Sequence, residues 1–292
     1  MERSKKRNFA VFILTNGRPD RVYTYKTLKK CGYTGRTFLI VDDLDKTGSE
    51  YRERYGEQVV VFDKNDIARR FDTGDNFNDM RAVFYARNAC FDIAKKLGVE
   101  YFIQLDDDYT DFAYRFNNKY EFKHRYIKNL DRIFELMCRL YDRTGALTVA
   151  MAQGGDFVGG SEGDFARKIT IKRKAMNSFI CSVNKPFEFV GRINEDVNTY
   201  TTLGRKGELI YTVNVIALNQ KTTQKNKGGM SEMYLDTGTY LKSFYSIMYA
   251  PSCCEVSIMK TRHRRIHHKI NWNMAVPKIG RASCRERVYS GV

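Results

Sequence analysis

Three consecutive carboxylates, Asp106, Asp107 and Asp108, end a short apolar run that begins at Tyr101. A run of this length and composition is typical of a buried strand in a parallel sheet. Because unpaired acids are costly to bury, we expect the three aspartates at the carboxyl end of that strand, where open α/β sheets bind their ligands. Mg²⁺ and Mn²⁺ prefer carboxylate oxygens and often share them with phosphates. A solvated acidic turn would give the same pattern.

Three apolar runs earlier in the chain have the same form, a short strand followed by polar residues. The run at 9–14 is followed by Thr15, the run at 37–41 by Asp42 and Asp43, and the run at 59–62 by Asp63 and Lys64. Helical patterns fill the intervals, from about residue 21 to 30, where Asp20 could cap the helix, and from Met80 to Leu97, stopped by Gly98. This alternation predicts a right-handed, mostly parallel α/β sheet.

Arg87 lies on the apolar stripe of the second of these helices, seven residues after Met80 and seven before Ala94. An unpaired cation is costly to bury, so we expect the guanidinium of Arg87 to meet an anion. The acidic end of the sheet follows closely in sequence, which favours a bound ligand as that anion. The alternative is that the side chain extends from the edge of the stripe into solvent.

The second half of the chain has a different pattern. A helix over residues 126–141 is closed by Gly145, and a strand over 147–152 leads to Gln153, Gly154 and Gly155. These open a Gly-rich segment, 154–163, suited to lie beside a bulky ligand. Later elements are expected as strands at 169–171, 179–183 and 209–215, a short helix that residues 191–197 open and that ends near Gly204, a basic loop at 221–229 and a helix at 240–248. We therefore expect a mostly parallel half followed by a mixed half.

The composition is that of a globular protein. The chain has 292 residues, of which 42% are hydrophobic and 13% aromatic, enough for one large domain or two small ones. No apolar run approaches the roughly 20 residues of a membrane span, and the basic N-terminus leads into a strand rather than a signal peptide. The seven cysteines form no C-x-x-C pair, which is typical of reduced cytoplasmic thiols and argues against a structural zinc site.

Residues 279–292 read like an in-frame translation of a common sequencing-adapter oligonucleotide, and we expect them to be no part of the fold. This segment has three Arg and one Glu, so the remainder keeps a net charge of +14 out of +16. Such a basic excess implies an anionic partner, either nucleic acid, a membrane surface or a phosphorylated substrate. We expect residues 1–278 to form one domain, with a nucleotide half at about 8–110 and an acceptor half at about 111–278.

Three segments, in order, resemble the TET-associated glycosyltransferases of bacteriophages. They are FILTNGRPD at residues 12–20, YARNA at 85–89 and LDDDY at 105–109, and the resemblance covers about residues 8–275. It implies a GT-A fold, a Rossmann-like and mostly parallel sheet flanked by helices. It also implies a UDP-sugar donor, an Mn²⁺ or Mg²⁺ ion, and duplex DNA as acceptor. A TET-like dioxygenase would oxidise 5-methylcytosine, and this chain would add sugar to the 5-hydroxymethylcytosine formed, in the cytoplasm of the infected bacterium.

The resemblance also implies roles for individual residues. Asp108 would be the direct metal ligand, with Asp106 nearer the ribose, and His263 or His268 would complete the metal shell. Glu195 or Asp196 would take the proton from the acceptor hydroxyl. The other residues expected to contact the donor are Thr15, Arg18, Asp42, Asp43, Lys64, Arg87 and Asp107. Those expected to contact the acceptor are Gln153, Gly154, Gly155, Lys225 and Lys227.

Several alternatives remain open at this point. Glu195 and Asp196 could be helix N-terminal acids favoured by the helix dipole, and the late histidines lie in a basic strip that could contact nucleic acid. The donor site would be the same in a GT-A enzyme that acts on an anionic glycan or lipid. In a nuclease or a non-enzymatic DNA-binding module, the three aspartates would instead hold metals against a phosphodiester.

Overall fold

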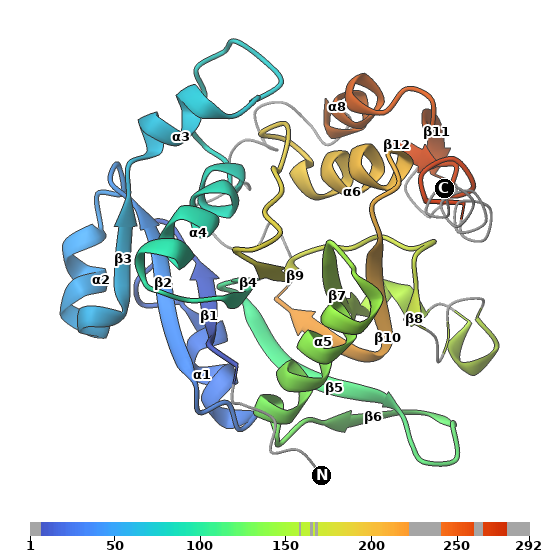
Figure 1. The fold of residues 1–292 in the computed structure, drawn as a ribbon, viewed down its shortest axis with the longest axis horizontal. Helices are drawn as coiled ribbons and strands as arrows, with labels where there is room; N and C mark the ends of the chain where they lie inside the picture. Colours follow the sequence, from blue (N-terminus) through green and yellow to red (C-terminus); the bar gives the residue numbers. More distant parts are fainter. Residues whose placement is uncertain are drawn as a thin grey trace, which may run out of the picture.

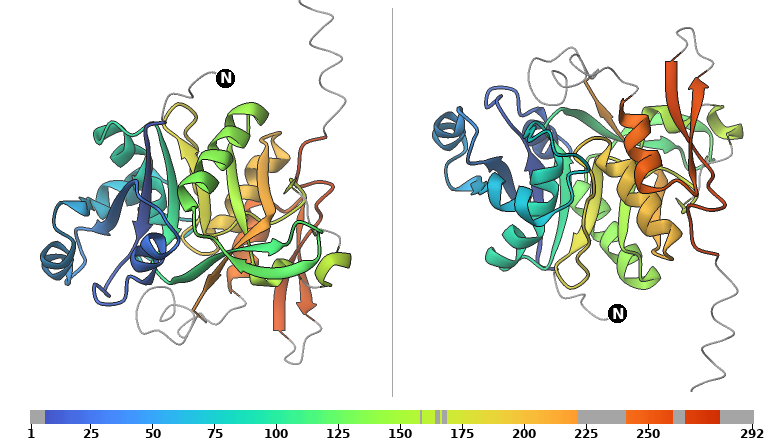
Figure 2. Two further views of the ribbon diagram at one scale, coloured as in Figure 1. Left: turned by 90° about the horizontal axis from the view of Figure 1, so that it is seen from below. Right: turned by 90° about the horizontal axis from the view of Figure 1, so that it is seen from above.

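A single large sheet organises the computed structural model, which describes residues 7–157, 159–163, 166, 169–221, 241–259 and 265–278. The strand order is β3-β2-β1-β4-β9-β7-β10-β5-β6, with β8 paired to β10 (Figure 1). A separate hairpin of β11 and β12 lies beside α8 and α6, away from α2 at the other end of the molecule (Figure 2). The described part of the chain has no helix long and apolar enough to cross a bilayer.

The first half alternates strand and helix, and its four strands are parallel. The elements are β1 (Phe9–Leu14), α1 (Tyr23–Lys30), β2 (Arg36–Asp42), α2 (Gly48–Tyr55), β3 (Val59–Phe62), α3 (Lys64–Arg70), α4 (Phe84–Lys96) and β4 (Tyr101–Asp106). In this half the predicted strands are confirmed, β1 and β3 to the residue. The parallel pairing brings the carboxyl ends of all four strands, with their polar residues, to one edge of the sheet.

The second half is mixed, as predicted. Its elements are β5 (Tyr109–Phe116), β6 (Phe122–Tyr126), α5 (Leu130–Thr144), β7 (Thr148–Gln153), β8 (Ile169–Thr170), β9 (Ser178–Ser182), α6 (Glu195–Arg205), β10 (Ile210–Gln220), α8 (Leu241–Tyr249), β11 (Cys254–Met259) and β12 (Arg265–Ile270). Strand β9 is antiparallel to both β4 and β7, and β10 lies parallel to β7 and antiparallel to β5. The α/β fold class, a mostly parallel sheet flanked by helices with a mixed second half, is confirmed.

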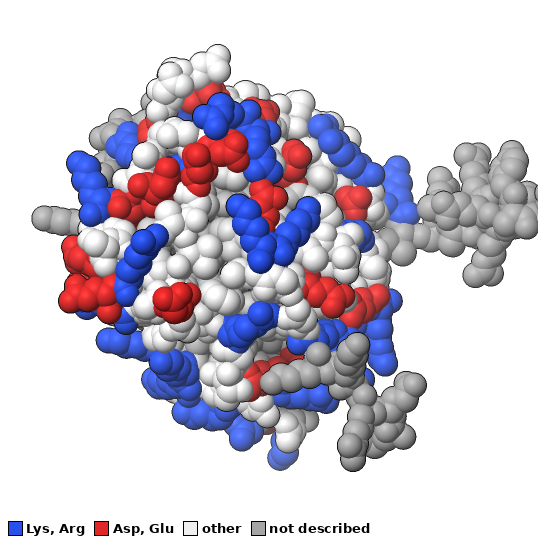
Figure 3. Space-filling view, turned by 60° about the vertical axis from the view of Figure 1, so that its left-hand side comes forward, with Lys and Arg blue, Asp and Glu red and all other residues white. Residues whose placement is uncertain are grey.

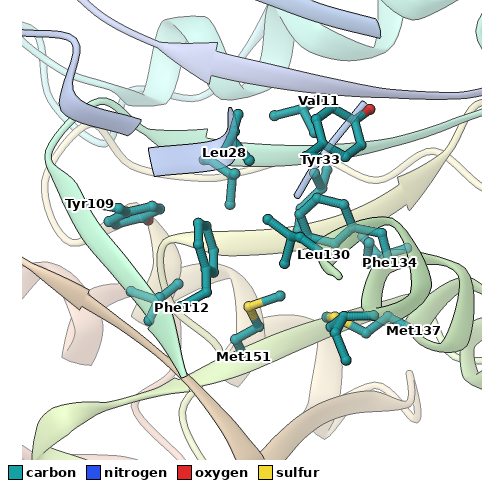
Figure 4. Packing of buried hydrophobic residues seen from close by; sticks show 14 of the residues in the cluster. Val11, Leu28, Tyr33, Tyr109, Phe112, Leu130, Phe134, Met137 and Met151 are labelled. Atoms are coloured by element: carbon teal, nitrogen blue, oxygen red, sulfur yellow. The ribbon is translucent and has the colours of Figure 1, made fainter. Parts of the chain in front are cut away.

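Two apolar cores lie on the two faces of the sheet, as the alternation of side chains along β1 shows. Val11 and Ile13 enter one core, whereas Ala10 and Phe12 enter the other. The first core packs the sheet against α1 and α5, with Leu28, Phe112 and Phe134 among its residues (Figure 4). Each large apolar side chain that is fully buried contributes about 1.5–3 kcal/mol. These cores fix the strand ends in place.

Three predicted helix starts are wrong. The helical pattern was expected from Met80, but α4 begins at Phe84. Asp20 does not cap α1, because the N-cap position is Val22, without a side-chain cap. The N–H of Thr24 instead donates to the carbonyl of Asp107 at 3.1 Å, so the N-terminus of α1 is bound to the acidic turn itself. The fifth helix begins at Leu130 rather than at Tyr126, which lies in β6, and the side chain of Asn129 caps it by accepting from the N–H of Arg132 at 3.1 Å.

Candidate active site

The three aspartates form the connection from β4 to β5, at the carboxyl edge of the parallel strands. Asp107 is 1% exposed, and its Oδ2 accepts from the hydroxyl of Thr15 at 2.6 Å and from Nε of Arg18 at 2.8 Å. Its other oxygen, Oδ1, is buried without a hydrogen-bond partner. Asp107 therefore holds the loop after β1 against the acidic turn.

Asp106 and Asp108 carry negative charge that the protein only partly compensates. Burial, followed by repulsion from Asp106 and Asp107, raises the pKa of Asp108 to about 7. Burial also raises the pKa of Asp106 to about 6, although the guanidinium of Arg87 opposes this shift. Oδ1 of Asp108 is buried without a hydrogen-bond partner. A divalent cation fits this arrangement, because it would supply both the missing partner and the missing positive charge.

A second group of polar side chains lies at the ends of β2 and β3. Oδ2 of Asp42 accepts from Nδ2 of Asn16 at 2.8 Å and from Nζ of Lys64 at 3.1 Å, and both members of the ion pair are nearly buried. Asp43 is exposed, and its Oδ1 accepts from the backbone N–H of Lys64 at 2.9 Å. The structure thus brings together Asp42, Asp43 and Lys64, which we expected on the donor side.

Arg87 links three elements of the site. Its Nε donates to Oε1 of Glu195 at 2.8 Å, and its Nη2 donates to Oδ1 of Asp106 at 3.0 Å. The guanidinium also lies 5.2 Å from the ring centroid of Phe179 and 5.7 Å from that of Phe189. Arg87 is fully buried, and the anionic partner that a buried guanidinium requires is supplied by these two carboxylates. Direct contact with the donor stays a prediction.

Glu195 and Asp196 begin α6, and both are buried. Asn194 precedes them in the left-handed region, with φ 61°, and its Nδ2 donates to the hydroxyl of Ser246 at 2.6 Å. Burial and the neighbouring charge of Glu195 raise the pKa of Asp196. Asp196 makes no ion pair within the described residues, whereas Oε1 of Glu195 already holds Arg87. Asp196 is therefore the better suited of the two to accept a proton near neutral pH.

The late histidines are only partly described. His268 lies in β12, where burial, His267 and Lys242 lower its pKa to about 3, so its imidazole is neutral and able to bind a metal. His263 lies outside the described residues. Within the residues that the structure describes, no three side chains of His, Cys, Asp or Glu form a group that could hold a metal. Ligation by a histidine therefore stays a prediction. Of the expected metal ligands, only Asp106 and Asp108 lie in the same turn, where burial and the charge of Asp106 raise the pKa of Asp108.

The expected acceptor residues are also described in part. Gln153 ends β7, where its N–H donates to Oδ2 of Asp156 at 2.8 Å and its side-chain Nε2 is buried without a partner. Gly154 and Gly155 begin a short 3-10 helix, whereas Lys225 and Lys227 lie outside the described residues. The N–H of Lys221 donates to the carbonyl of Asp108 at 3.1 Å, so the chain after β10 departs from the acidic turn.

Sequence reasoning missed Tyr51, a fully buried residue of α2 that supports the donor side. Its hydroxyl lies 2.7 Å from Oγ1 of Thr15 and accepts from the N–H of Arg18 at 3.1 Å. The only signal is a pair of tyrosines, Tyr51 and Tyr55, four residues apart among polar neighbours, which is too short a pattern to identify a helix.

Comparison with known proteins gives distant structural likenesses and one family. A glucosyl-3-phosphoglycerate synthase from Mycobacterium tuberculosis, in complex with Mg²⁺ and UDP, is 9% identical with a TM-score of 0.45, over 91% of this chain and 88% of that one. TarS from S. aureus is 10% identical with a TM-score of 0.44, over 81% of this chain and 39% of that one. No curated protein matches. The profile of the TET-Associated Glycosyltransferase family matches residues 9–229, so the chain belongs to this family of glycosyltransferases.

Proposed function

We propose that this glycosyltransferase moves a sugar from a UDP-sugar to the hydroxymethyl group of 5-hydroxymethylcytosine in duplex DNA, with Mn²⁺ or Mg²⁺ as cofactor. The observation that carries the proposal is the acidic turn at the edge of the parallel strands, where burial and neighbouring carboxylates raise the pKa values of Asp106 and Asp108, although Arg87 partly compensates the charge of Asp106. A TET-like dioxygenase would supply the acceptor alcohol by oxidising 5-methylcytosine.

The donor would lie along the carboxyl ends of β1, β2 and β4. Asp108 and Asp106 would hold the divalent ion, which supplies Lewis-acid stabilisation of the leaving diphosphate. Thr15 and Arg18, bound to Asp107, would line the nucleotide pocket, and Asp42 would accept from the N3–H of uracil. Lys64, whose Nζ donates to Asp42, would hold this carboxylate in place on the donor side. These contacts orient the anomeric carbon toward the acceptor.

The acceptor alcohol would be activated at the start of α6. As its oxygen attacks the anomeric carbon, its proton would pass to a carboxylate oxygen of Asp196, while Glu195 stays paired with Arg87. Gln153, Gly154 and Gly155 would lie on the acceptor side. This proton transfer applies to an inverting reaction, in which the base and the leaving group lie on opposite faces of the sugar.

The basic character of the chain supports DNA as the acceptor, because phosphate contacts position a duplex without reading its sequence. Outside residues 279–292 the net charge is +14. On the face shown in Figure 3, acidic and basic side chains are mixed in the upper half, and Lys and Arg predominate below. The loop that contains Lys225 and Lys227 would add further phosphate contacts.

The test is to offer duplexes containing 5-hydroxymethylcytosine or cytosine with a panel of UDP-sugars and to weigh the digested nucleosides. We expect sugar only on 5-hydroxymethylcytosine, because cytosine lacks the alcohol. Both duplexes should bind, with affinities that weaken similarly as the salt concentration rises. Depletion of the metal with EDTA should stop transfer, and Mn²⁺ or Mg²⁺ should restore it.

The basic surface would also suit a second acceptor class, an anionic glycan or lipid. The donor site would be unchanged in such an enzyme. If no donor modifies 5-hydroxymethylcytosine while a carbohydrate or lipid acceptor is extended, this second assignment replaces the first.

A further inference from the structure

The hairpin of β5 and β6 is a basic, aromatic edge of the main sheet that the chemistry described above does not use. Strand β6 ends the sheet order, and all five of its residues are exposed. The hairpin, residues 109–126, contains four Lys and Arg and two acids. Of the four cations, only Lys123 forms an ion pair within the described chain, with Glu121 at 3.1 Å, whereas the other acid, Asp111, lies 3.7 Å from Nε2 of His124. The remaining positive charges are available to an anionic partner.

Arg115 shows this surplus charge most clearly. Its guanidinium carbon lies 4.7 Å from the ring centroid of Phe157 and 4.9 Å from that of Phe122. Nη1 lies 3.0 Å from Nδ1 of His124, and Nε is buried without a hydrogen-bond partner. The aromatic rings fix the plane of the guanidinium without neutralising it. A planar, preoriented guanidinium of this kind is well suited to bind a phosphate.

The tip of the hairpin presents an aromatic side chain on a well-defined turn. Tyr120 is 64% exposed and has φ 60°, a left-handed conformation that costs a bulky residue about 1–2 kcal/mol. Asn117 holds the turn, because its Oδ1 accepts from the N–H groups of Lys119 and Glu121, both at 2.9 Å. Asn or Gly would fit this conformation with less strain. A strained, exposed tyrosine on an ordered turn suggests selection for contact with a partner.

The hairpin begins at the reaction site. Strand β5 starts at Tyr109, directly after Asp108, and its eight residues extend about 26 Å at ~3.3 Å per residue. This length corresponds to about seven or eight base pairs along the axis of a duplex, at ~3.4 Å of rise each. In Figure 1 the hairpin runs along the lower edge of the molecule, away from α3 and α4. A DNA backbone following β5 would therefore pass from the tip toward the acidic turn.

We infer that the β5–β6 hairpin binds the sugar-phosphate backbone of the duplex acceptor beside the target nucleotide. Arg115 and Arg125 would contact phosphates from opposite faces of the hairpin, because Arg125 pairs with Tyr114 rather than with Arg115. Lys119 would contact a further phosphate at the tip, and Tyr120 would pack against a deoxyribose. The inference rests on the proposed DNA acceptor. Charged side chains on an edge strand also prevent pairing between molecules. That role, however, requires neither an arginine without a carboxylate partner nor a strained tyrosine.

The experiment compares two double variants in fluorescence-anisotropy titrations of an unmodified duplex at several salt concentrations. Lys119→Gln with Arg125→Gln removes two charges from the hairpin. Arg52→Gln with Arg54→Gln removes two exposed charges from α2, at the other end of the sheet. For the hairpin variant we expect the slope of log K against log salt to be less steep by about 1.8, or ~0.9 per lost phosphate contact. The α2 variant should keep the wild-type slope.

A third variant, Tyr120→Asn, separates contact from folding. Asn tolerates the left-handed conformation, so we expect an equal or higher melting temperature together with weaker DNA binding. A hairpin variant with the wild-type slope, or a Tyr120→Asn protein of unchanged affinity, would overturn the inference while the proposed acceptor stands. Wild-type protein that binds no duplex at all would instead overturn the DNA acceptor, and the inference with it.

Discussion

Asp108 is the residue on which the proposed donor site most depends. We predict that Asp108→Asn lowers kcat for sugar transfer by about a hundredfold or more, because Lewis-acid catalysis is worth several kcal/mol. The melting temperature should stay equal or rise, since the substitution removes repulsion among three carboxylates. Transfer assays and calorimetry measure the two effects. Asp20→Asn, at an exposed aspartate outside the turn, is the matched control, and full turnover by Asp108→Asn would refute the metal assignment.

The same carboxylates predict how stability depends on pH. The pKa of Asp108 is raised to about 7 and that of Asp106 to about 6 in the folded state, against roughly 4 in an unfolded chain. Between these values the folded state binds more protons, so the free energy of unfolding of metal-free protein should fall as pH rises from about 4 to about 7.

Urea denaturation in EDTA across this pH range provides the measurement. Saturating Mn²⁺ should remove most of the decline, because a bound cation keeps both carboxylates ionised at little cost. Asp108→Asn should make the curve flatter. A metal-free protein whose stability rises over the same range would contradict the assigned electrostatics.

At the scale of elements, Arg87 joins α4, β4 and α6. We predict that Arg87→Met lowers the free energy of unfolding by about 3–5 kcal/mol, because it leaves the buried Glu195 and the half-buried Asp106 without the cation that pairs with both. Arg87→Lys should cost less and lower kcat more than it raises the donor KM, since a lysine cannot hold both carboxylates. Denaturation curves and donor titrations separate the effects. Arg70→Met, in an exposed ion pair with Asp66 and Asp92, should cost at most about 1 kcal/mol.

The elements that sequence patterns predicted are those with a clear apolar face. The run that became β1 and the stripe of α4 bury their apolar residues as expected, whereas β3, at one end of the sheet, buries only Phe62. Helix α2 was missed because Tyr51 is its only buried residue, and β6 was missed because all its residues are exposed. Helix α2 has only the pair Tyr51 and Tyr55 at helical spacing, and β6 has no buried face and is held by its pairing with β5.

The site was predictable to the same degree. Clusters such as Asp106 to Asp108, which follow a strand, could be placed at the sheet edge from sequence. The need of Arg87 for an anion was also visible, but its partner Glu195 lies 108 residues away, and no local pattern encodes such a pairing. Similarly, the three aspartates differ in their surroundings. Asp107 is hydrogen-bonded to Thr15 and Arg18, whereas the negative charge of Asp106 and Asp108 is only partly compensated. Three identical neighbours in sequence gave no basis for that difference.

For the whole molecule, we predict that deletion of residues 279–292 leaves the melting temperature and sugar transfer unchanged. The segment resembles translated adapter sequence, and it carries only two of the sixteen net positive charges. DNA affinity should accordingly weaken only slightly and with a nearly unchanged salt slope. Thermal denaturation and anisotropy of the shortened and full chains give the comparison. A large loss of stability would show that native residues had been removed.

The order of strands in the sheet has a consequence for folding. Strand β10 lies between β7 and β5, although β5 is synthesised about a hundred residues earlier, as the contact between Thr110 and Asn219 illustrates at a separation of 109 residues. Until β10 inserts, both neighbours have an unpaired edge, and such edges favour association between chains. Contacts this distant in sequence also slow folding. On the ribosome, the acidic turn would therefore reach its final form only after β10 has emerged, which makes assembly of the reaction centre one of the last events in the folding of the chain.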